Sequence, residues 1–360
     1  MSKAAELAKI GDVANSGQLS GRRNIIYNGN LQCWQRSTNT TGLGAASGYF
    51  TADRWRVAIN DASAGRFTMS RTAGDPDGFN YGLVINCTTA DTSIAAGEVL
   101  IIQQKLEGQD LQHLKKGTSG AETITISFYA KIVGSATDFV VELVDLDNTR
   151  QISKIFTFTT DWVRYYWTVP GDTSGALGQD ANASLALHFW LHGGSTFTGG
   201  TLSTAWTSTT NANRAAGNDS IFASTDNEFY LAGVQMEIGS QATNFEHRSF
   251  GEELALCQRY YEIMWGGSSD YPNSLILYKA NSTTEGMSIL KFATPKRAGG
   301  TFAHTGTPVM YPGGDVTSVA SDTFGILGGR ARFTPTSNIV VNEAGHLDGG
   351  GSTAVADAEL

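Results

Sequence analysis

Hydrophobic and polar residues alternate along most of the chain after residue 24. The clearest case is residues 123–131, where Ile124, Ile126 and Phe128 share one face. Side chains alternate between the two faces of a strand, so this pattern predicts a half-buried β-strand. Shorter runs of the same kind predict further strands at residues 54–59, 66–70, 81–87, 98–104, 139–146, 152–158, 163–169, 184–192 and 228–238.

About ten short strands, separated by turn residues and without alternating helices, predict an all-β protein. The layer rules then favour an antiparallel jelly-roll sandwich over residues 24–250. Within it, residues 193–219 are rich in Gly, Ser, Thr and Asn with little periodicity, which predicts a long surface excursion between two strands.

The remaining segments predict two smaller parts. Residues 251–360 begin with a helical turn and continue as short strands at 274–279, 287–293, 300–304, 326–333 and 339–342, so we expect a small β-sandwich domain. Residues 2–10 have an apolar stripe that includes Leu7 and Ile10. Nine residues do not hold a helix alone in water. We therefore expect residues 1–23 to form a short helical arm that packs against a partner.

Composition narrows the class of protein. Glycine is frequent, at 42 residues, and charged residues make up 16%, which is typical of short strands joined by tight turns. The formal net charge is −9 and no basic group along the chain is longer than a pair, which argues against nucleic-acid binding. No apolar run approaches the roughly 20 residues that span a bilayer, and the start lacks a signal-peptide core. We therefore expect no membrane insertion, and synthesis in a cytosol. The three separated cysteines are expected to be buried thiols.

Several segments together resemble a module found in tail-fibre and virion structural proteins of tailed bacteriophages. Residues 24–36 (NIIYNGNLQCWQR) resemble its opening phrase, and residues 49–55 (YFTADRW) its second. The remaining phrases follow in the expected order, at 104–108 (QKLEG), 126–131 (ISFYAK), 233–240 (GVQMEIGS), 242–246 (ATNFE) and 253–261 (ELALCQRYY). Residues 263–360 resemble the β domain that commonly follows, including 293–297 (ATPKR) and 357–360 (DAEL).

This resemblance implies a jelly roll similar to carbohydrate-binding modules and a place in a virion appendage. It implies a structural fibre or adhesion subunit that attaches to the host surface, with a host glycan as one partner. The other partners are further copies of the chain, as a homo-oligomer and most often a trimer, and other virion proteins, to which residues 1–23 would dock. The alternatives are a capsid-decorating or tail-joint protein without a receptor role, and a polysaccharide-degrading tail protein.

No catalytic constellation is evident. Glycoside hydrolysis needs two carboxylates at a set separation, and sequence gives no reason to pair any two of the candidates. Signatures of serine hydrolases, zinc proteases and nucleotide-binding loops are also absent. We expect a non-enzymatic protein without a cofactor. The candidate carboxylates are Glu98, Glu107, Glu122, Glu142, Glu228 and Glu237.

One turn offers ligands of the kind that calcium prefers. Asp145 and Asp147 alternate with Leu146 before Asn148, which would place oxygen ligands on one side of a turn. The same residues also favour turns through local hydrogen bonds. We favour the turn and keep calcium as the alternative.

The strand at residues 184–192 has the most distinctive predicted face. If its leucines and Phe189 face the core, then His188, Trp190 and His192 face outward. An exposed indole between hydrogen-bonding groups suits the stacking of a sugar ring. The same row also fits a subunit interface, or a face covered by the excursion at residues 193–219, and we favour these two alternatives over the sugar platform. His188 and His192 would need a third ligand to hold a metal.

Overall fold

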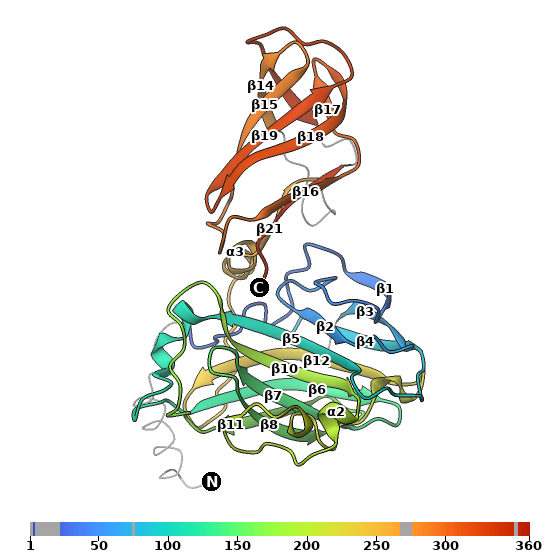
Figure 1. The fold of residues 1–360 in the computed structure, drawn as a ribbon, viewed down its shortest axis with the longest axis vertical. Helices are drawn as coiled ribbons and strands as arrows, with labels where there is room; N and C mark the ends of the chain where they lie inside the picture. Colours follow the sequence, from blue (N-terminus) through green and yellow to red (C-terminus); the bar gives the residue numbers. More distant parts are fainter. Residues whose placement is uncertain (1–2, 4–21, 74–75, 267–275, 349–351) are drawn as a thin grey trace. The chain divides into compact units, whose positions relative to one another are not determined.

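The computed structural model describes residues 3, 22–73, 76–266, 276–348 and 352–360 (Figure 1). The chain divides into two compact units, Met1–Ser249 and Phe250–Leu360. The sequence-based boundary between residues 250 and 251 lies one residue from this division. Of the predicted arm at residues 1–23, only Lys3, Arg22 and Arg23 are described, so Leu7 and Ile10 lie outside the described residues. No helix in the described ranges is long and apolar enough to cross a membrane.

The first unit is a sandwich of two antiparallel six-stranded sheets, which confirms the predicted all-β jelly-roll class. The first sheet runs in the order β1 (Asn39–Leu43), β3 (Arg66–Ala73), β4 (Tyr81–Thr89), β12 (Glu228–Ile238), β6 (Ile124–Val133) and β9 (Val163–Val169). The second sheet runs in the order β11 (Thr207–Ser208), β8 (Arg150–Thr157), β7 (Asp138–Asp145), β10 (Ala183–Gly193), β5 (Val99–Glu107) and β2 (Arg56–Asn60).

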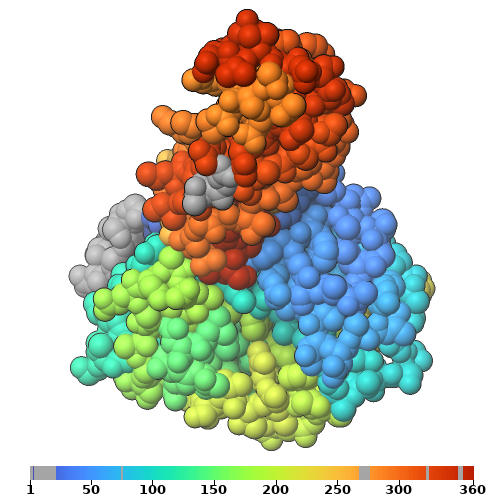
Figure 2. Space-filling model, turned by 45° about the horizontal axis from the view of Figure 1, so that its top comes forward, coloured from blue at the N-terminus to red at the C-terminus, as the bar shows by residue number. Residues whose placement is uncertain are grey.

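Short helical turns decorate the connections of this sandwich. The excursion after β10 carries α2 (Ser195–Thr198), β11 and a 3-10 turn, η3 (Asn211–Asn213). The other 3-10 turns are η1 (Gly108–Asp110), η2 (Gln112–Leu114) and η4 (Ile221–Ala223). In the space-filling view the yellow-green excursion forms part of the outer surface of this unit (Figure 2).

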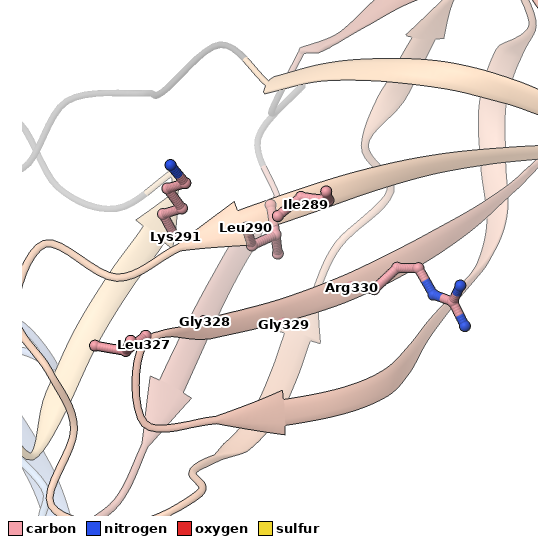
Figure 3. A pocket seen from close by; sticks show the side chains of 7 residues that line it. All are labelled: Ile289, Leu290, Lys291, Leu327, Gly328, Gly329 and Arg330. Atoms are coloured by element: carbon pink, nitrogen blue, oxygen red, sulfur yellow. The ribbon is translucent and has the colours of Figure 1, made fainter.

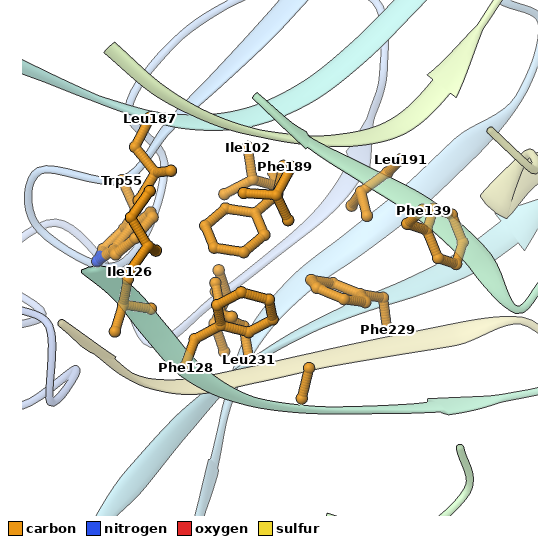
Figure 4. Packing of buried hydrophobic residues seen from close by; sticks show 14 of the residues in the cluster. Trp55, Ile102, Ile126, Phe128, Phe139, Leu187, Phe189, Leu191, Phe229 and Leu231 are labelled. Carbon is orange, nitrogen blue, oxygen red and sulfur yellow. The ribbon is translucent and has the colours of Figure 1, made fainter. Parts of the chain in front are cut away.

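Aromatic and aliphatic side chains from both sheets fill the space between them. Phe128 of β6 meets Phe189 of β10 edge to face, with ring centroids 5.1 Å apart. Trp55, Phe139 and Phe229 close the same cluster from neighbouring segments (Figure 4). The period-2 pattern of β6 is therefore explained by packing of its apolar face in the core between the sheets.

The segment before β1 is irregular, and buried side-chain amides fix it in place. The Asn28 side chain donates to the carbonyls of Cys33 (2.8 Å) and Asp53 (3.0 Å) and accepts from Cys33 N (2.9 Å). Asn28 also has a left-handed backbone with φ of 51°. The Trp55 indole donates to the Asn28 carbonyl at 3.1 Å, and Gln35 Nε2 donates to the Asp53 carboxylate at 2.9 Å.

The same segment is bonded to both sheets. The Gln104 amide of β5 exchanges two hydrogen bonds of 2.8 Å with the backbone of Tyr27. On the other side, Asn24 Oδ1 accepts from Met236 N of β12 at 3.0 Å. A Cβ on Gly29 would lie 2.1 Å from the Val234 carbonyl, so only glycine allows this approach. The residues that carry the phage-like phrases at 24–36, 49–55 and 104–108 therefore include the ones that anchor this segment.

The second unit combines one helix, a three-stranded sheet and a closed barrel. The helix is α3 (Phe250–Gln258), at the predicted helical turn, and the sheet order is β13 (Tyr261–Trp265), β21 (Thr353–Asp357) and β16 (Thr301–Thr305). The barrel runs through β14 (Ile276–Ser282), β15 (Glu285–Lys291), β19 (Gly328–Pro335), β18 (Gly314–Gly325), β17 (Val309–Tyr311) and β20 (Ala344–Asp348).

The antiparallel β character of this unit matches the prediction, but its strands close into a barrel instead of forming two facing sheets. Glycines make room for the Tyr278 ring on the inside. A Cβ at Gly286 would lie 2.7 Å from that ring, and one at Gly345 would lie 2.6 Å from it. The buried core around Tyr278, Met310, Phe333 and Leu347 is correspondingly small.

We predict that Asn28→Ala lowers the free energy of unfolding of the first unit by about 2–4 kcal/mol, because three buried backbone groups lose their partner. Asn30→Ala is the matched control. The Asn30 side chain is equally buried, and neither of its polar atoms has a hydrogen-bond partner among the described residues. Denaturant unfolding measures both variants. Equal losses for Asn28→Ala and Asn30→Ala would contradict the anchoring role.

Candidate functional site

The strand at residues 184–192 forms β10, and its alternation is as predicted. Leu185, Leu187, Phe189 and Leu191 enter the core between the sheets, and His188, Trp190 and His192 lie on the opposite face. That face is covered. Trp190 and His192 have no exposed surface and His188 has 6%. A sugar ring cannot stack on a fully buried indole, so the structure contradicts glycan contact by these three side chains.

The excursion at residues 193–219 provides the cover. Phe197 of α2 packs on Trp190 with ring centroids 5.5 Å apart, and Ala215 completes the contact. The covered-face alternative is therefore correct. The largely polar composition of the excursion does not indicate this packing, because its few apolar residues, such as Phe197, Leu202 and Ala215, are separated by polar ones.

Beneath the excursion, one carboxylate organises the buried polar groups. Glu142 of β7 accepts from Arg214 Nε and Nη2, both at 2.9 Å, and from Trp190 Nε1 at 2.8 Å. His188 Nδ1 lies 3.0 Å from the same carboxylate. Burial raises the pKa of Glu142, but the hydrogen bond from His188 and the charge of Arg214 outweigh it and hold the pKa below its ordinary value. Burial lowers the pKa of His188. The group is therefore a neutral histidine and an Arg–Glu ion pair that holds the excursion down.

His192 has a similar structural role. Its Nε2 lies 3.0 Å from the Glu98 carboxylate and its Nδ1 lies 2.7 Å from Ser220 Oγ, beside η4. Burial lowers the pKa of His192 below its ordinary value, although Glu98 opposes the shift. His188 and His192 do not share a ligand position, because each is engaged with a different carboxylate.

The candidate calcium residues are engaged with protein partners. Asp145 is fully buried, forms an ion pair with Lys116, and accepts from Asn148 N at 2.9 Å. Lys116 also lies 3.0 Å from Asp172, to which Arg150 Nε donates at 2.7 Å. Asp147 turns elsewhere and accepts from Gly178 N at 2.7 Å.

The Lys116 ammonium therefore supplies the positive charge that a bound cation would bring to Asp145. In the described ranges no group of three or more His, Cys, Asp or Glu side chains is placed to hold a metal ion. Asp145 and Asp147 are thus engaged by an ion pair and by turn hydrogen bonds.

The candidate carboxylates are engaged by other polar side chains. Beyond the partners of Glu98 and Glu142, Glu107 accepts from Gln109 (2.7 Å) and Glu237 accepts from Gln235 (2.8 Å). Glu122 pairs with Lys115. Each of these carboxylates thus has a partner other than a second carboxylate.

The outer face of the first sheet carries a cluster that the sequence did not reveal. The register places Tyr230 of β12 opposite Lys131 of β6, and Glu228 opposite Asn86 of β4. Trp162, directly before β9, meets Tyr230 edge to face with ring centroids 6.0 Å apart. We call these five residues the Trp162–Tyr230 cluster. Lys131 belongs to the polar face of its strand in the sequence pattern, but only the register brings the two rings beside it.

The cluster combines aromatic rings with groups that form hydrogen bonds. The Lys131 ammonium lies 4.5 Å from the Tyr230 ring centroid and 5.4 Å from that of Trp162, and has no hydrogen-bond or ion-pair partner among the described residues. Glu228 accepts from Tyr230 Oη (2.5 Å) and Asn86 Nδ2 (2.9 Å). Trp162 Nε1 has no acceptor among the described residues.

The Tyr230 hydroxyl stays protonated at neutral pH. Burial, followed by the hydrogen bond and charge of Glu228, raises the pKa of Tyr230 to about 12. Both rings are partly exposed. The cluster therefore presents two partly exposed aromatic rings, the Lys131 cation and the Glu228 carboxylate on one face of the sheet, with the Trp162 Nε1 atom buried beneath the surface.

A hollow in the first unit, of about 390 Å³, has a mixed polar and apolar lining. Its polar groups include Gln112, whose amide already donates to the carbonyls of Gly108 (2.8 Å) and Gly178 (2.7 Å), and the paired Lys116. It has no exposed aromatic ring in its lining, and its main polar groups are engaged.

No protein-family profile and no curated protein matches this chain. Solved structures with similarity include a family 4 carbohydrate-binding module, at 14% identity and a TM-score of 0.31, over 59% of this chain and 99% of that one. A family 61 carbohydrate-binding module in complex with β-1,4-galactotriose matches at 7% identity and a TM-score of 0.32, over 60% of this chain and 99% of that one.

A third similar structure is the enzymatically active domain of tailspike protein 4 from bacteriophage CBA120. It matches at 12% identity and a TM-score of 0.29, over 61% of this chain and 22% of that one. Values this low assign neither a family nor a function to this chain.

We predict that Arg214→Met destabilises the first unit by about 3–5 kcal/mol, because it leaves the buried Glu142 carboxylate without its ion pair. Adding Glu142→Gln should recover part of this loss, since the buried charge is then gone. Denaturant unfolding of the Arg214→Met variant and of the Arg214→Met/Glu142→Gln double variant measures both effects. A change below about 1 kcal/mol for Arg214→Met would show that the ion pair does not hold the excursion.

We also predict that the first unit loses stability as the pH falls below about 6.5. The pKa values of His188 and His192 are lowered by burial, so the unfolded chain takes up protons before the folded one does. The stability that comes from keeping these histidines neutral is fully present at pH values above the pKa of the unfolded chain. It is lost as the pH falls toward their lower pKa values in the folded protein. The lowered pKa of Glu142 adds a further loss below about 4.5.

Unfolding free energies at pH 7, 6 and 5 measure this effect. The variant His188→Gln/His192→Gln should show a shallower slope, with the remainder due to His113, whose pKa burial also lowers. A stability that is flat between pH 7 and 5 in the unmodified protein would contradict the assignment of neutral buried histidines.

Proposed function

We propose that this protein is a non-enzymatic structural subunit of a tailed-phage virion, of the fibre or adhesion type, which attaches to the host surface by binding glycan. The observation that carries glycan binding is the Trp162–Tyr230 cluster. Pyranose rings offer C–H faces to aromatic side chains and hydroxyls to donors and acceptors. The cluster supplies both kinds of contact on one exposed sheet face.

The virion assignment is supported by the order of the phage-like phrases along residues 24–262. Several of their residues, such as Asn28, Asp53 and Gln104, fix the segment that joins the two sheets. The phrases therefore indicate a shared fold for the first unit, and the ligand is argued from the cluster. We propose that the chain is made in the bacterial cytoplasm, assembles as a homotrimer, and docks to other virion proteins through residues 1–23.

The non-enzymatic part of the proposal is supported by the engaged carboxylates. A retaining or inverting glycosidase needs two carboxyl groups about 5–10 Å apart on either side of the scissile bond. In the cluster, Glu228 is the single carboxylate, and two donors already occupy its oxygens.

We predict that Trp162→Ala weakens binding to host-surface glycan roughly tenfold, through loss of about 1.5 kcal/mol of ring contact. Tyr166→Ala is the control. Tyr166 is the most exposed aromatic residue described in the first unit, at 63%, and lies four residues further along the chain, outside the cluster. Binding of purified full-length variants to host polysaccharide by biolayer interferometry gives both affinities.

The outcomes separate the alternatives. Equal affinities for the two variants would place the binding site elsewhere, and no binding by the unmodified protein would favour a capsid-decorating or tail-joint role. Release of reducing ends or unsaturated sugars from the polysaccharide would identify a depolymerase and overturn the non-enzymatic assignment.

A further inference from the structure

The outer wall of the barrel carries a row of exposed side chains that the proposed glycan site does not use. Leu277 of β14 and Ile289 of β15 are 71% and 77% exposed. Lys279 pairs with Met287 in the register, so the same spacing places Leu277 beside Ile289 on the two strands. Two exposed aliphatic side chains thus lie side by side at the middle of the wall.

The row continues across the neighbouring strands on both sides. Leu277 is opposite His346 of β20, and His346 is opposite Tyr311 of β17. On the other side, Ile289 is opposite Arg330 of β19. We call these five residues the barrel row.

Next to the row, a groove of about 550 Å³ runs between β15 and the start of β19. Leu327, which is 66% exposed, lies at one end of it, and Ile289, Lys291 and Arg330 line the rest (Figure 3). In the first unit, by contrast, the exposed large aliphatic side chains of the described residues reach at most 43% exposure. Single exposed apolar residues are ordinary, but a contiguous patch marks an interaction surface.

The two ends of the row differ in chemistry and complement each other. At one end the Tyr311 and His346 rings stack, with centroids 5.1 Å apart and planes at 21°. The exposed Asp315 lies close by, since it pairs with Val309, two residues before Tyr311. At the other end are the exposed cations Arg330 and Lys291. Cations favour the faces of aromatic rings and nearby carboxylates.

This complementarity indicates a second copy of the chain as the occupant. A surface with a cationic end and an aromatic, acidic end is self-complementary, because two copies about a two-fold axis, or several copies head to tail in a closed ring, bring each cationic end onto an aromatic end. The homotrimer of the proposed function corresponds to the ring. The barrel order places β20 and β19 on either side of the β14–β15 pair. In a ring, Leu277 and Ile289 then face the axis, and the two flanks meet the neighbouring copies.

We propose that copies of this chain assemble through the barrel row, with Leu277 and Ile289 around the symmetry axis and Arg330 of each copy against the Tyr311–His346 ring pair of the next. This inference rests on the oligomer named in the proposed function and supplies its contact surface. It is independent of glycan recognition, which belongs to the first unit.

The test is the solution mass of the full chain by sedimentation velocity at micromolar concentration. The unmodified protein should have three times the mass of the 38.3 kDa chain, and Leu277→Glu/Ile289→Glu should be a monomer. Ile94→Glu is the control, because Ile94 is exposed at 43% in the first unit and should leave the oligomer intact. A monomeric unmodified protein, or an oligomer that survives the double glutamate variant, would overturn the proposal.

A second variant covers the case in which the glutamates unfold the barrel. Tyr311→Cys/Arg330→Cys should form disulfides between copies on mild oxidation, seen as covalent oligomers on non-reducing gels. The natural cysteines Cys33, Cys87 and Cys257 are buried and do not compete. Absence of cross-linked oligomers in a folded variant would count against the contact.

Glycan affinity, measured on sparsely immobilised protein so that single chains bind, separates this inference from the proposed function. If the unmodified protein is a monomer and Trp162→Ala still lowers its glycan affinity, the proposed barrel interface is wrong and the proposed glycan site stands. If the protein is an oligomer that the double glutamate variant dissociates, but it has no glycan affinity, the barrel interface stands and the glycan site is wrong.

Discussion

The first unit depends on hydrogen bonds that involve buried amide side chains and fix an irregular segment, residues 24–36, to one strand of each sheet. Residues 24–36 are almost entirely buried, yet they form no regular ladder with either sheet. Buried backbone N–H and C=O groups must still find partners. Asn24, Asn28 and Gln104 supply them, because each amide both donates and accepts. Without these bonds several backbone polar groups of the segment would be unpaired in the core. The segment would then no longer be held against the two sheets.

The sequence predicts those parts of the fold that depend on local pattern. Alternation in residues 123–131 and 184–192 locates β6 and β10 and assigns their inward faces correctly, because apolar side chains at every second position pack between the two sheets. The arrangement of the second unit depends on whether its strands close into a barrel, which no local pattern shows. Its short strands fit a sandwich or a barrel equally well, and only the contacts of Gly286 and Gly345 with Tyr278 show why the barrel forms.

Side-chain function was harder to predict, because it depends on partners distant in sequence. Trp190 was placed on the correct face, but its cover comes from Phe197 and Ala215 in a segment of polar composition. Asp145 had the appearance of a cation ligand, and the cation is Lys116, 29 residues earlier. Trp162, Lys131 and Tyr230 come together only through the register of three strands, which no single-strand pattern reveals.

The two proposed activities of the protein, glycan binding and self-association, thus use two different surfaces. The sheet face in the first unit offers contacts of modest strength to a sugar, and the barrel wall in the second unit offers a contact between copies. Linked sites convert weak single contacts into firm attachment, since each bound site raises the effective concentration of the others.

The most direct measurement of the central claim is a crystal structure of the protein with an oligosaccharide from the host surface. We predict a sugar ring against Trp162 and Tyr230, with a hydroxyl or carboxylate near Lys131. A sugar bound at another place, or an empty cluster at saturating oligosaccharide, would contradict the account.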